Sequence, residues 1–83
     1  MIASGTSIGA NVEEAQSASS KKDFINKMTI ALREAKETRY WLRIFYSCDL
    51  ADKIKLEKLM EECLEIVKII TTIIKNSKTN SKL

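Results

Sequence analysis

The sequence predicts an all-α protein, an antiparallel up-down helical bundle of three helices that amounts to an incomplete four-helix bundle. The 83 residues contain no proline and only two glycines, both near the start, so most of the chain lacks the strongest helix breakers. Apolar residues recur at alternating spacings of four and three, which is typical of helices buried on one face. Two such stripes mirror each other along the chain, as an antiparallel helical hairpin requires. The length favours a single domain over residues 1–83.

The first helix is expected over about residues 2–18. Its stripe consists of Met1, Gly5, Ile8, Val12 and Ala15. Two glycines in a small-residue stretch raise the question of a phosphate-binding loop, but Gly9 is followed by Ala10 and Asn11, where a P-loop needs lysine. Each helical glycine costs about 1 kcal/mol relative to alanine, and close packing would offset that cost. We therefore expect a helix face against which a bulky element lies.

The second helix is expected over residues 21–48 and the third over 51–76, followed by a frayed basic tail over 77–83. Ser20 is a suitable N-cap with Asp23 in the first turn, and Asp49 to Asp52 offers a second cap at a tight connection. The stripe of the second helix is Phe24, Met28, Ala31, Ala35, Thr38, Leu42 and Phe45. That of the third is Leu56, Leu59, Cys63, Ile66, Ile70, Ile73 and Ser77.

The two stripes pair in one antiparallel register, in which Ala35 faces Ile66 and Ala31 faces Ile70. Small residues on one helix thus oppose large residues on the other. The first helix folds back onto the second in the same way, and the expected pairs are Gly5 with Ala35, Ile8 with Leu32, Val12 with Met28, and Ala15 with Ile25.

The string TSIGANVEEAQSASSKKDFINKMTIALREAKETRYWL resembles the four helix bundle protein family, also called the 23S rRNA intervening-sequence protein family. Members carry a pattern similar to S-I-x-A-N-I-x-E-A, a polar turn, and D-F-I-x-K-L-x-I-A-L-x-E-A-x-E-T-x-Y-W-L. The resemblance is close over about residues 4–42 and generic over 43–75. It implies a bacterial bundle that assembles into a homo-oligomeric ring, a pentamer, and a chain that lacks the family's first helix. A related bundle family acts with reverse transcriptases and is thought to bind nucleic acid.

The chain contains no histidine, which removes the commonest general base and the Glu-x-x-His metal motif of helical bundles. We therefore expect no enzyme, no catalytic residue, no metal, no cofactor and no small-molecule substrate. Two carboxylates of the second helix, Glu34 and Glu37, are expected either in a structural polar layer with Ser7 and Asn11 or on a solvated face. Cys48 and Cys63 lie too far apart in the paired register for a disulfide, so both are expected as free thiols.

Basic residues of the second helix form the candidate nucleic-acid site, and they are Arg33, Lys36, Arg39 and Arg43. The last three share one helix face and could neutralise a few phosphates, although a solvated face with ordinary i, i+4 ion pairs is the simpler explanation. Tyr40 and Trp41 beside them fit packing, a subunit interface or base stacking.

The third helix carries a second apolar stripe beside the first, and its apolar surface is therefore wider than one hairpin needs. The second stripe supplies candidate interface residues. Together with the tryptophan, these are Trp41, Met60, Val67 and Ile74. We expect a non-enzymatic self-associating bundle with RNA or DNA as a possible partner; the alternative is a purely structural or degenerate bundle with no ligand. We expect no signal peptide and no membrane span, because the start lacks a basic region followed by a long apolar core and the most apolar run is far shorter than the roughly 20 residues of a membrane span. A cytoplasmic protein with no membrane partner is expected.

Overall fold

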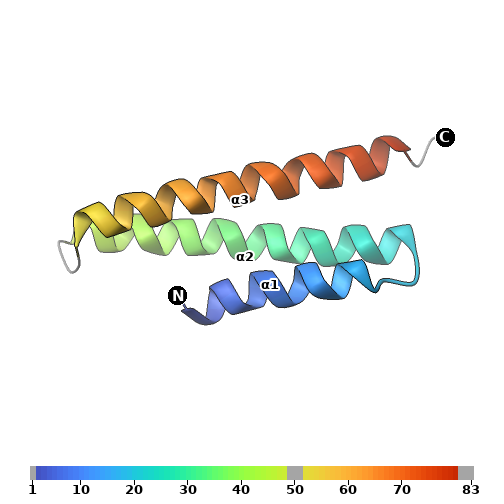
Figure 1. Cartoon of the computed structure of the whole chain (residues 1–83), viewed down its shortest axis with the longest axis horizontal. Helices are drawn as coiled ribbons and strands as arrows, with labels where there is room; N and C mark the ends of the chain where they lie inside the picture. Colours follow the sequence, from blue (N-terminus) through green and yellow to red (C-terminus); the bar gives the residue numbers. More distant parts are fainter. Residues whose placement is uncertain (1, 49–51, 81–83) are drawn as a thin grey trace.

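Three α-helices make up the computed structural model, which describes residues 2–48 and 52–80, with side chains from residue 8 to residue 79 apart from the gap. Helix α1 spans Ile2–Gln16, α2 spans Lys21–Ser47 and α3 spans Lys53–Asn80 (Figure 1). The described residues form no strand, so the predicted all-α fold is confirmed. The elements follow one another up, down and up, as the mirrored stripes predict.

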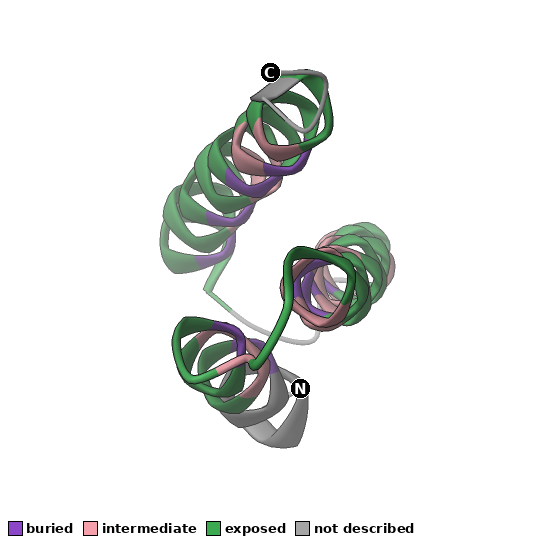
Figure 2. Ribbon diagram, turned by 90° about the vertical axis from the view of Figure 1, so that its right-hand side faces the viewer, coloured by how far each residue is buried: buried purple, intermediate pink, exposed green. Residues whose placement is uncertain are grey.

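The middle helix α2 carries both of its neighbours. α1 and α3 each pack along α2, whereas no Cα atom of α1 comes within 8 Å of α3 among the described residues. Viewed along the bundle, the three helices occupy the corners of a triangle, and the buried residues of each face inwards (Figure 2). The molecule is therefore elongated, with extents of 49 × 21 × 14 Å.

The core divides into two clusters along this length. Where all three helices meet, the buried residues are Ile8, Ala15, Met28, Ala31, Ala35, Ile70 and Ile74. Towards the α2–α3 connection only these two helices contribute, and the buried residues are Leu42, Leu56 and Cys63. Ala31 and Ala35 are 0% exposed, so the small side chains let the neighbouring helices approach α2 closely.

Side chains fix where α2 and α3 begin. Ser20 has extended backbone angles, φ −150° and ψ 162°, and its hydroxyl accepts a hydrogen bond from the Asp23 N–H at 3.1 Å. This confirms the predicted N-cap. At α3, Asp52 Oδ1 accepts from the Ile54 N–H at 2.9 Å, so the cap is Asp52 and the helix begins at Lys53 rather than at residue 51. Asp49 lies outside the described residues.

Two helix ends differ from the prediction. α1 ends at Gln16, before the expected residue 18, because the chain turns there with the Ser17 N–H bonded to Glu14 O at 3.1 Å. α3 continues to Asn80, so the expected frayed tail is wrong for residues 77–80, and residues 81–83 lie outside the described part. No glycine or proline follows residue 76, and Lys78 in the last turn suits the negative helix end.

The buried stripe of α2 is confirmed, but α3 is rotated relative to the prediction. Leu59 and Ile66 were expected in the seam, and they are 42% and 38% exposed. Their places are taken by Met60 and Val67, which pack against the two clusters, and by Ile74, which is buried. Leu56, Cys63 and Ile70 belong to both patterns. On the surface of α3, other apolar residues flank these three on both sides. The spacing of apolar residues alone therefore did not decide which of the two flanks faces α2.

Candidate nucleic-acid interface on α2

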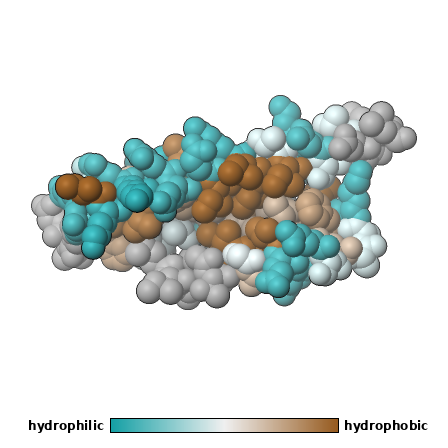
Figure 3. Space-filling view, viewed as in Figure 1, coloured by the Kyte–Doolittle hydropathy of each residue, from teal (hydrophilic) through white to brown (hydrophobic). Residues whose placement is uncertain are grey.

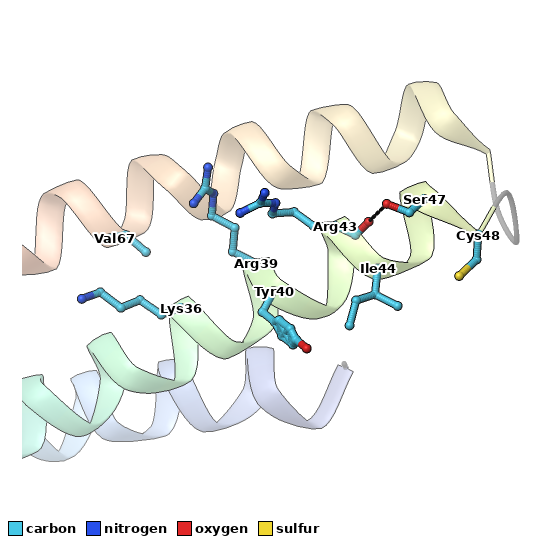
Figure 4. Close-up of a pocket in the computed structure, with 8 residues that line it drawn as sticks. All are labelled: Lys36, Arg39, Tyr40, Arg43, Ile44, Ser47, Cys48 and Val67. Carbon is cyan, nitrogen blue, oxygen red and sulfur yellow. Dashed lines mark hydrogen bonds between the residues drawn. The ribbon is translucent and has the colours of Figure 1, made fainter.

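Three of the four predicted basic residues meet in one hollow on α2. Lys36, Arg39 and Arg43 line it together with Tyr40, Ile44, Ser47, Cys48 and, from α3, Val67 (Figure 4). The hollow has a volume of about 660 Å³. The basic residues follow spacings of three and four, which place them on one face of a helix. The predicted stripe is thus a single surface in the folded chain.

A second hollow adjoins the first and contains the fourth basic residue. Arg33 and Lys36 line it with Tyr40 and Trp41, and its volume is about 750 Å³. Lys36 and Tyr40 belong to both hollows, so the two form one continuous strip along α2. We call this strip the basic-aromatic face; it comprises Arg33, Lys36, Arg39, Tyr40, Trp41 and Arg43.

The charge on this face is positive. No acidic residue lines the first hollow, and Glu37 lines the second. The ion pair of the described chain lies elsewhere, between Lys27 Nζ and Glu14 Oε2 at 3.1 Å. Within residues 8–48 and 52–79, no carboxylate is within ion-pair distance of any of the four basic residues. Their charges are therefore available to a ligand, and the expectation that neighbouring carboxylates pair with them is not met.

The aromatic side chains on this face stand in solvent. Tyr40 is 57% exposed and Trp41 is 50% exposed, and their ring centroids are 5.7 Å apart with an interplanar angle of 56°. Figure 4 shows Tyr40 and Ile44 projecting to one side of α2 while Arg39 and Arg43 extend towards α3. Each ring is thus at least half exposed, so Trp41 is not part of either core cluster of the described residues.

Behind the basic-aromatic face lies the thiol of Cys63. It donates a hydrogen bond to the Ala35 carbonyl at 3.1 Å. Burial raises the pKa of this thiol, an effect partly offset by the Arg39 charge and by a hydrogen bond with the Arg39 backbone. Cys48 is exposed at the edge of the first hollow. Both cysteines are free, as predicted.

The predicted polar layer does not form a buried layer. Glu37 is exposed, and Asn11 and Glu34 are only half-buried. Among the residues whose side chains are described, none that is polar or charged is buried. The side chain of Ser7 lies outside that set. α1 lies on the side of α2 that carries Lys27, whose ammonium pairs with Glu14 at 3.1 Å. Glu34 follows seven residues later on that side and is half-buried, whereas Glu37 lies further round the helix and is exposed.

Three of the four predicted interface residues lie inside the hairpin. Ile74 is buried, and Met60 and Val67 are partly buried against the clusters. They do not form a free surface, because the rotation of α3 turns them towards α2. Trp41 is the one of the four that is exposed, and its assignment to an interface stays a prediction. Tyr40 and Ile44 were not among the predicted site residues, although their position beside the arginines, four residues apart, was a readable signal.

Neither a metal site nor a membrane-spanning helix is found among the described residues. Residues 2–48 and 52–80 bring together no group of three side chains able to hold a metal ion. Their helices are also not long and apolar enough to cross a membrane.

Comparison with known proteins supports the resemblance drawn from the sequence. The chain matches the family described as 23S rRNA-intervening sequence protein over residues 1–72. It is also similar to a solved crystal structure from Bacteroides thetaiotaomicron, a protein with unknown function from the S23 ribosomal protein family. The two chains are 47% identical, with a TM-score of 0.84.

That similarity covers 87% of this chain and 67% of the Bacteroides chain. No curated protein matches this chain. The family match extends from α1 through most of α3 and therefore includes the whole basic-aromatic face. On this evidence the chain belongs to the 23S rRNA-intervening sequence protein family.

Proposed function

We propose that this protein is a non-enzymatic binding module that contacts nucleic acid, RNA foremost, through the basic-aromatic face of α2. The observation that carries the proposal is the first hollow, where Lys36, Arg39 and Arg43 surround Tyr40 with no acidic residue in the lining. The description of the family, which refers to 23S rRNA, is consistent with RNA but does not itself name a ligand.

The chemistry of the face suits a single strand better than a duplex. Guanidinium and ammonium groups contact phosphates without regard to sequence, and exposed rings offer a flat surface for bases. Stacking on an aromatic side chain contributes about 1–3 kcal/mol per base. Tyr40 and Trp41 are tilted relative to each other, so each presents its own face to a base. A paired duplex would hide those bases.

Four phosphate contacts predict a definite salt dependence. The slope of log K against log salt is about −0.7 per contact for single strands, which gives a slope of roughly −3. Between about 50 and 200 mM salt, affinity should then fall by roughly 50-fold. Such steep dependence distinguishes phosphate binding from hydrophobic adsorption on the exposed rings.

Self-association is the second part of the proposal, and the half-exposed Trp41 together with Ile30, which is 38% exposed, supports it. The two side chains lie on the same side of α2, since eleven residues complete about three turns, and exposed large apolar side chains often mark an interface between proteins. Several copies would also multiply a weak site, because a polynucleotide engages them together. A cytoplasmic homo-oligomer, a pentamer by family resemblance, fits this role. The alternative is an assembly of purely structural function without a ligand.

The deciding experiment measures binding of a fluorescein-labelled single-stranded RNA by fluorescence anisotropy across a salt series. Double reversal, Arg39→Glu with Arg43→Glu, should abolish binding while circular dichroism shows an intact helical fold. The matched control is Lys21→Glu with Lys22→Glu, which changes charge equally on exposed residues at the start of α2. Equal loss in both variants would indicate a general charge effect and contradict the assignment of the site.

Light scattering after nuclease treatment tests self-association separately from nucleic-acid binding. An oligomer that persists at high salt, depends on Trp41 and binds no polynucleotide would favour the purely structural alternative. A monomer that still binds RNA would support the proposed RNA binding and contradict the proposed self-association.

A further inference from the structure

The second hollow of the basic-aromatic face contains a side chain that a purely phosphate-binding surface does not need. Its lining includes the exposed rings of Tyr40 and Trp41 and two basic residues, Arg33 and Lys36. Glu37 lines the same hollow. A carboxylate repels phosphates, so Glu37 weakens a site that recognises only the backbone of a nucleic acid. A ligand that brings hydrogen-bond donors to this carboxylate would offset the repulsion.

Glu37 lies one helical turn before both exposed rings. Tyr40 follows it by three residues and Trp41 by four, and these spacings make side chains neighbours on the surface of a helix. One turn advances by about 5.4 Å along the helix axis. A base stacked on either ring would therefore place one edge near the Glu37 carboxylate.

The carboxylate of Glu37 has no partner within the described chain. Among residues 8–48 and 52–79, no group donates a hydrogen bond to it and no basic residue lies within ion-pair distance. Its side chain is exposed. Both oxygens are thus available as acceptors, and a carboxylate can accept two parallel hydrogen bonds from a planar ligand.

Among the RNA bases, guanine matches the two oxygens of a carboxylate. Its Watson–Crick edge carries two adjacent donors, the ring N1–H and the 2-amino group, with no acceptor between them. Uracil has a single N–H between two carbonyl oxygens, and adenine and cytosine have a ring nitrogen acceptor beside the amino group. A carboxylate facing these other edges would meet an acceptor, and two acceptors repel each other. Single-stranded RNA leaves the Watson–Crick edges accessible.

We propose that Glu37 makes the basic-aromatic face selective for guanine in single-stranded RNA. The base stacks on Tyr40 or Trp41, and Glu37 accepts hydrogen bonds from its N1–H and 2-amino group. Arg33 and Lys36 contact the flanking phosphates. This inference rests on the proposed function, because it requires that the face binds RNA, and it adds the identity of a recognised base.

The hollow between α1 and α3 lacks this combination of side chains. Figure 3 shows it as an apolar surface between the upper and lower helices, and its lining includes Ile66, Ile69 and Ile73 of α3. Glu13 also lines it, but the lining contains neither an aromatic ring nor a basic residue. Because Glu13 is exposed, as Glu37 is, it provides a matched control for the removal of one negative charge.

The test measures fluorescence anisotropy with short labelled oligouridines that differ at one central base. The wild-type protein should bind the strand with a central guanosine about tenfold more tightly than the strand with adenosine, as expected for a bidentate contact to a base. Equal binding of both strands overturns the guanine assignment, while the proposed RNA binding stands. Binding of neither strand overturns both proposals.

Glu37→Gln distinguishes recognition of a base from simple repulsion of phosphate. Loss of the negative charge should raise the affinity for the adenosine strand and reduce the preference for guanosine to about twofold or less. Glu13→Gln removes the same charge elsewhere and should keep the preference of about tenfold. An equal gain of affinity for both strands in Glu37→Gln would show that Glu37 only repels phosphates, and it would contradict the proposal.

Guanosine analogues identify the edge of the base that the protein contacts. Inosine lacks the 2-amino group and should lose several-fold of the preference. The 7-deaza analogue lacks N7 but retains both donors, so it should bind as tightly as guanosine does. The opposite pattern would mean that arginine or lysine contacts N7 and O6, a common contact to guanine, and it would overturn the role of Glu37. Circular dichroism of each variant controls for folding.

Discussion

The two ends of the bundle are held together by different means. At the end near the α1–α2 turn, three helices enclose a core built around Ala31 and Ala35. At the other end only α2 and α3 meet, around Leu42, Leu56 and Cys63. At this end the hollow with the arginines lies beside the smaller core, and Val67 of α3 forms part of its wall. The open side of α2 continues towards the three-helix end, because the adjoining hollow reaches Thr29.

Polar contacts supplement the two-helix end. Tyr46 donates a hydrogen bond from its hydroxyl to Glu57 Oε1 at 2.9 Å, which joins α2 to α3. Lys53 Nζ lies 4.7 Å from the centre of the same ring, a cation–π contact. The three-helix end instead has one exposed ion pair between α1 and α2, which contributes at most about 1 kcal/mol. Apolar packing therefore dominates at the three-helix end, whereas apolar packing and polar contacts together hold the two-helix end.

The largest expected effects on stability come from substitutions that create a cavity in the core at either end of the bundle. Ile70→Ala at the three-helix end should destabilise the protein by about 3–5 kcal/mol, because surrounding side chains on three helices hold the cavity open. Leu56→Ala at the two-helix end should cost less, about 2–3 kcal/mol, because α2 and α3 can relax towards each other. Urea denaturation measures both. Equal losses would show that the ends do not differ in rigidity.

Overpacking should have a smaller effect at the centre of the bundle. Ala35→Leu introduces a large side chain at a residue with 0% exposure whose carbonyl accepts the Cys63 hydrogen bond. We expect a loss of about 1–3 kcal/mol, measured as a lower melting temperature. Ala10→Leu, at an exposed position of α1, is the control and should change stability by about 0.5 kcal/mol or less. An unchanged melting temperature for Ala35→Leu would contradict the close approach of helices.

A substitution at Gly9 of α1 should raise the stability instead of lowering it. Gly9→Ala adds a methyl group that meets nothing within 4 Å and improves helix propensity. Stability should rise by about 0.5–1 kcal/mol in thermal unfolding. A loss of stability instead would mean that α1 packs more closely at Gly9 than the structure shows.

The smallest effect concerns pH and the thiols. Burial raises the pKa of Cys63 above its ordinary value of 9.0, so the folded state binds the thiol proton more tightly than the unfolded state does. The stabilisation is complete below that pH and is lost as pH rises through the pKa of the folded state. Unfolding measured from neutral to alkaline pH should show this decline in wild type. Cys63→Ala should flatten it, whereas Cys48→Ala, at an exposed thiol, should not.

The sequence predicted α2 more fully than α3. The stripe of α2 borders charged residues on its outer side, so only one face could be buried, and Met28, Ala31, Ala35 and Leu42 are buried as expected. α3 offers isoleucine or leucine on both sides of Cys63 and Ile70, and its rotation depends on how closely the alanines of α2 let it approach. Periodicity alone carries no information on that distance.

For the candidate site, the basic residues and their common face followed from spacing on one helix. The hollow itself did not, because it depends on which parts of α2 the other helices leave open. The polar layer was predicted only in part: Glu34 lies on the side of α2 that faces α1 and is half-buried, whereas Glu37 is exposed. Helical geometry fixes relations within an element, whereas burial depends on the neighbours that pack against it.

The central position of α2 determines how the molecule can open. Among the described residues, Cα atoms of different helices approach within 8 Å only between α1 and α2 and between α2 and α3, so the close backbone contacts join helices that are consecutive in the chain. Such a chain of pairwise contacts folds quickly, and its outermost member can leave without disrupting the rest. α1, with 15 residues, is the shorter of the two outer helices. Its amide hydrogens should therefore exchange with deuterium before those of α2, through a partial unfolding that leaves the α2–α3 hairpin intact.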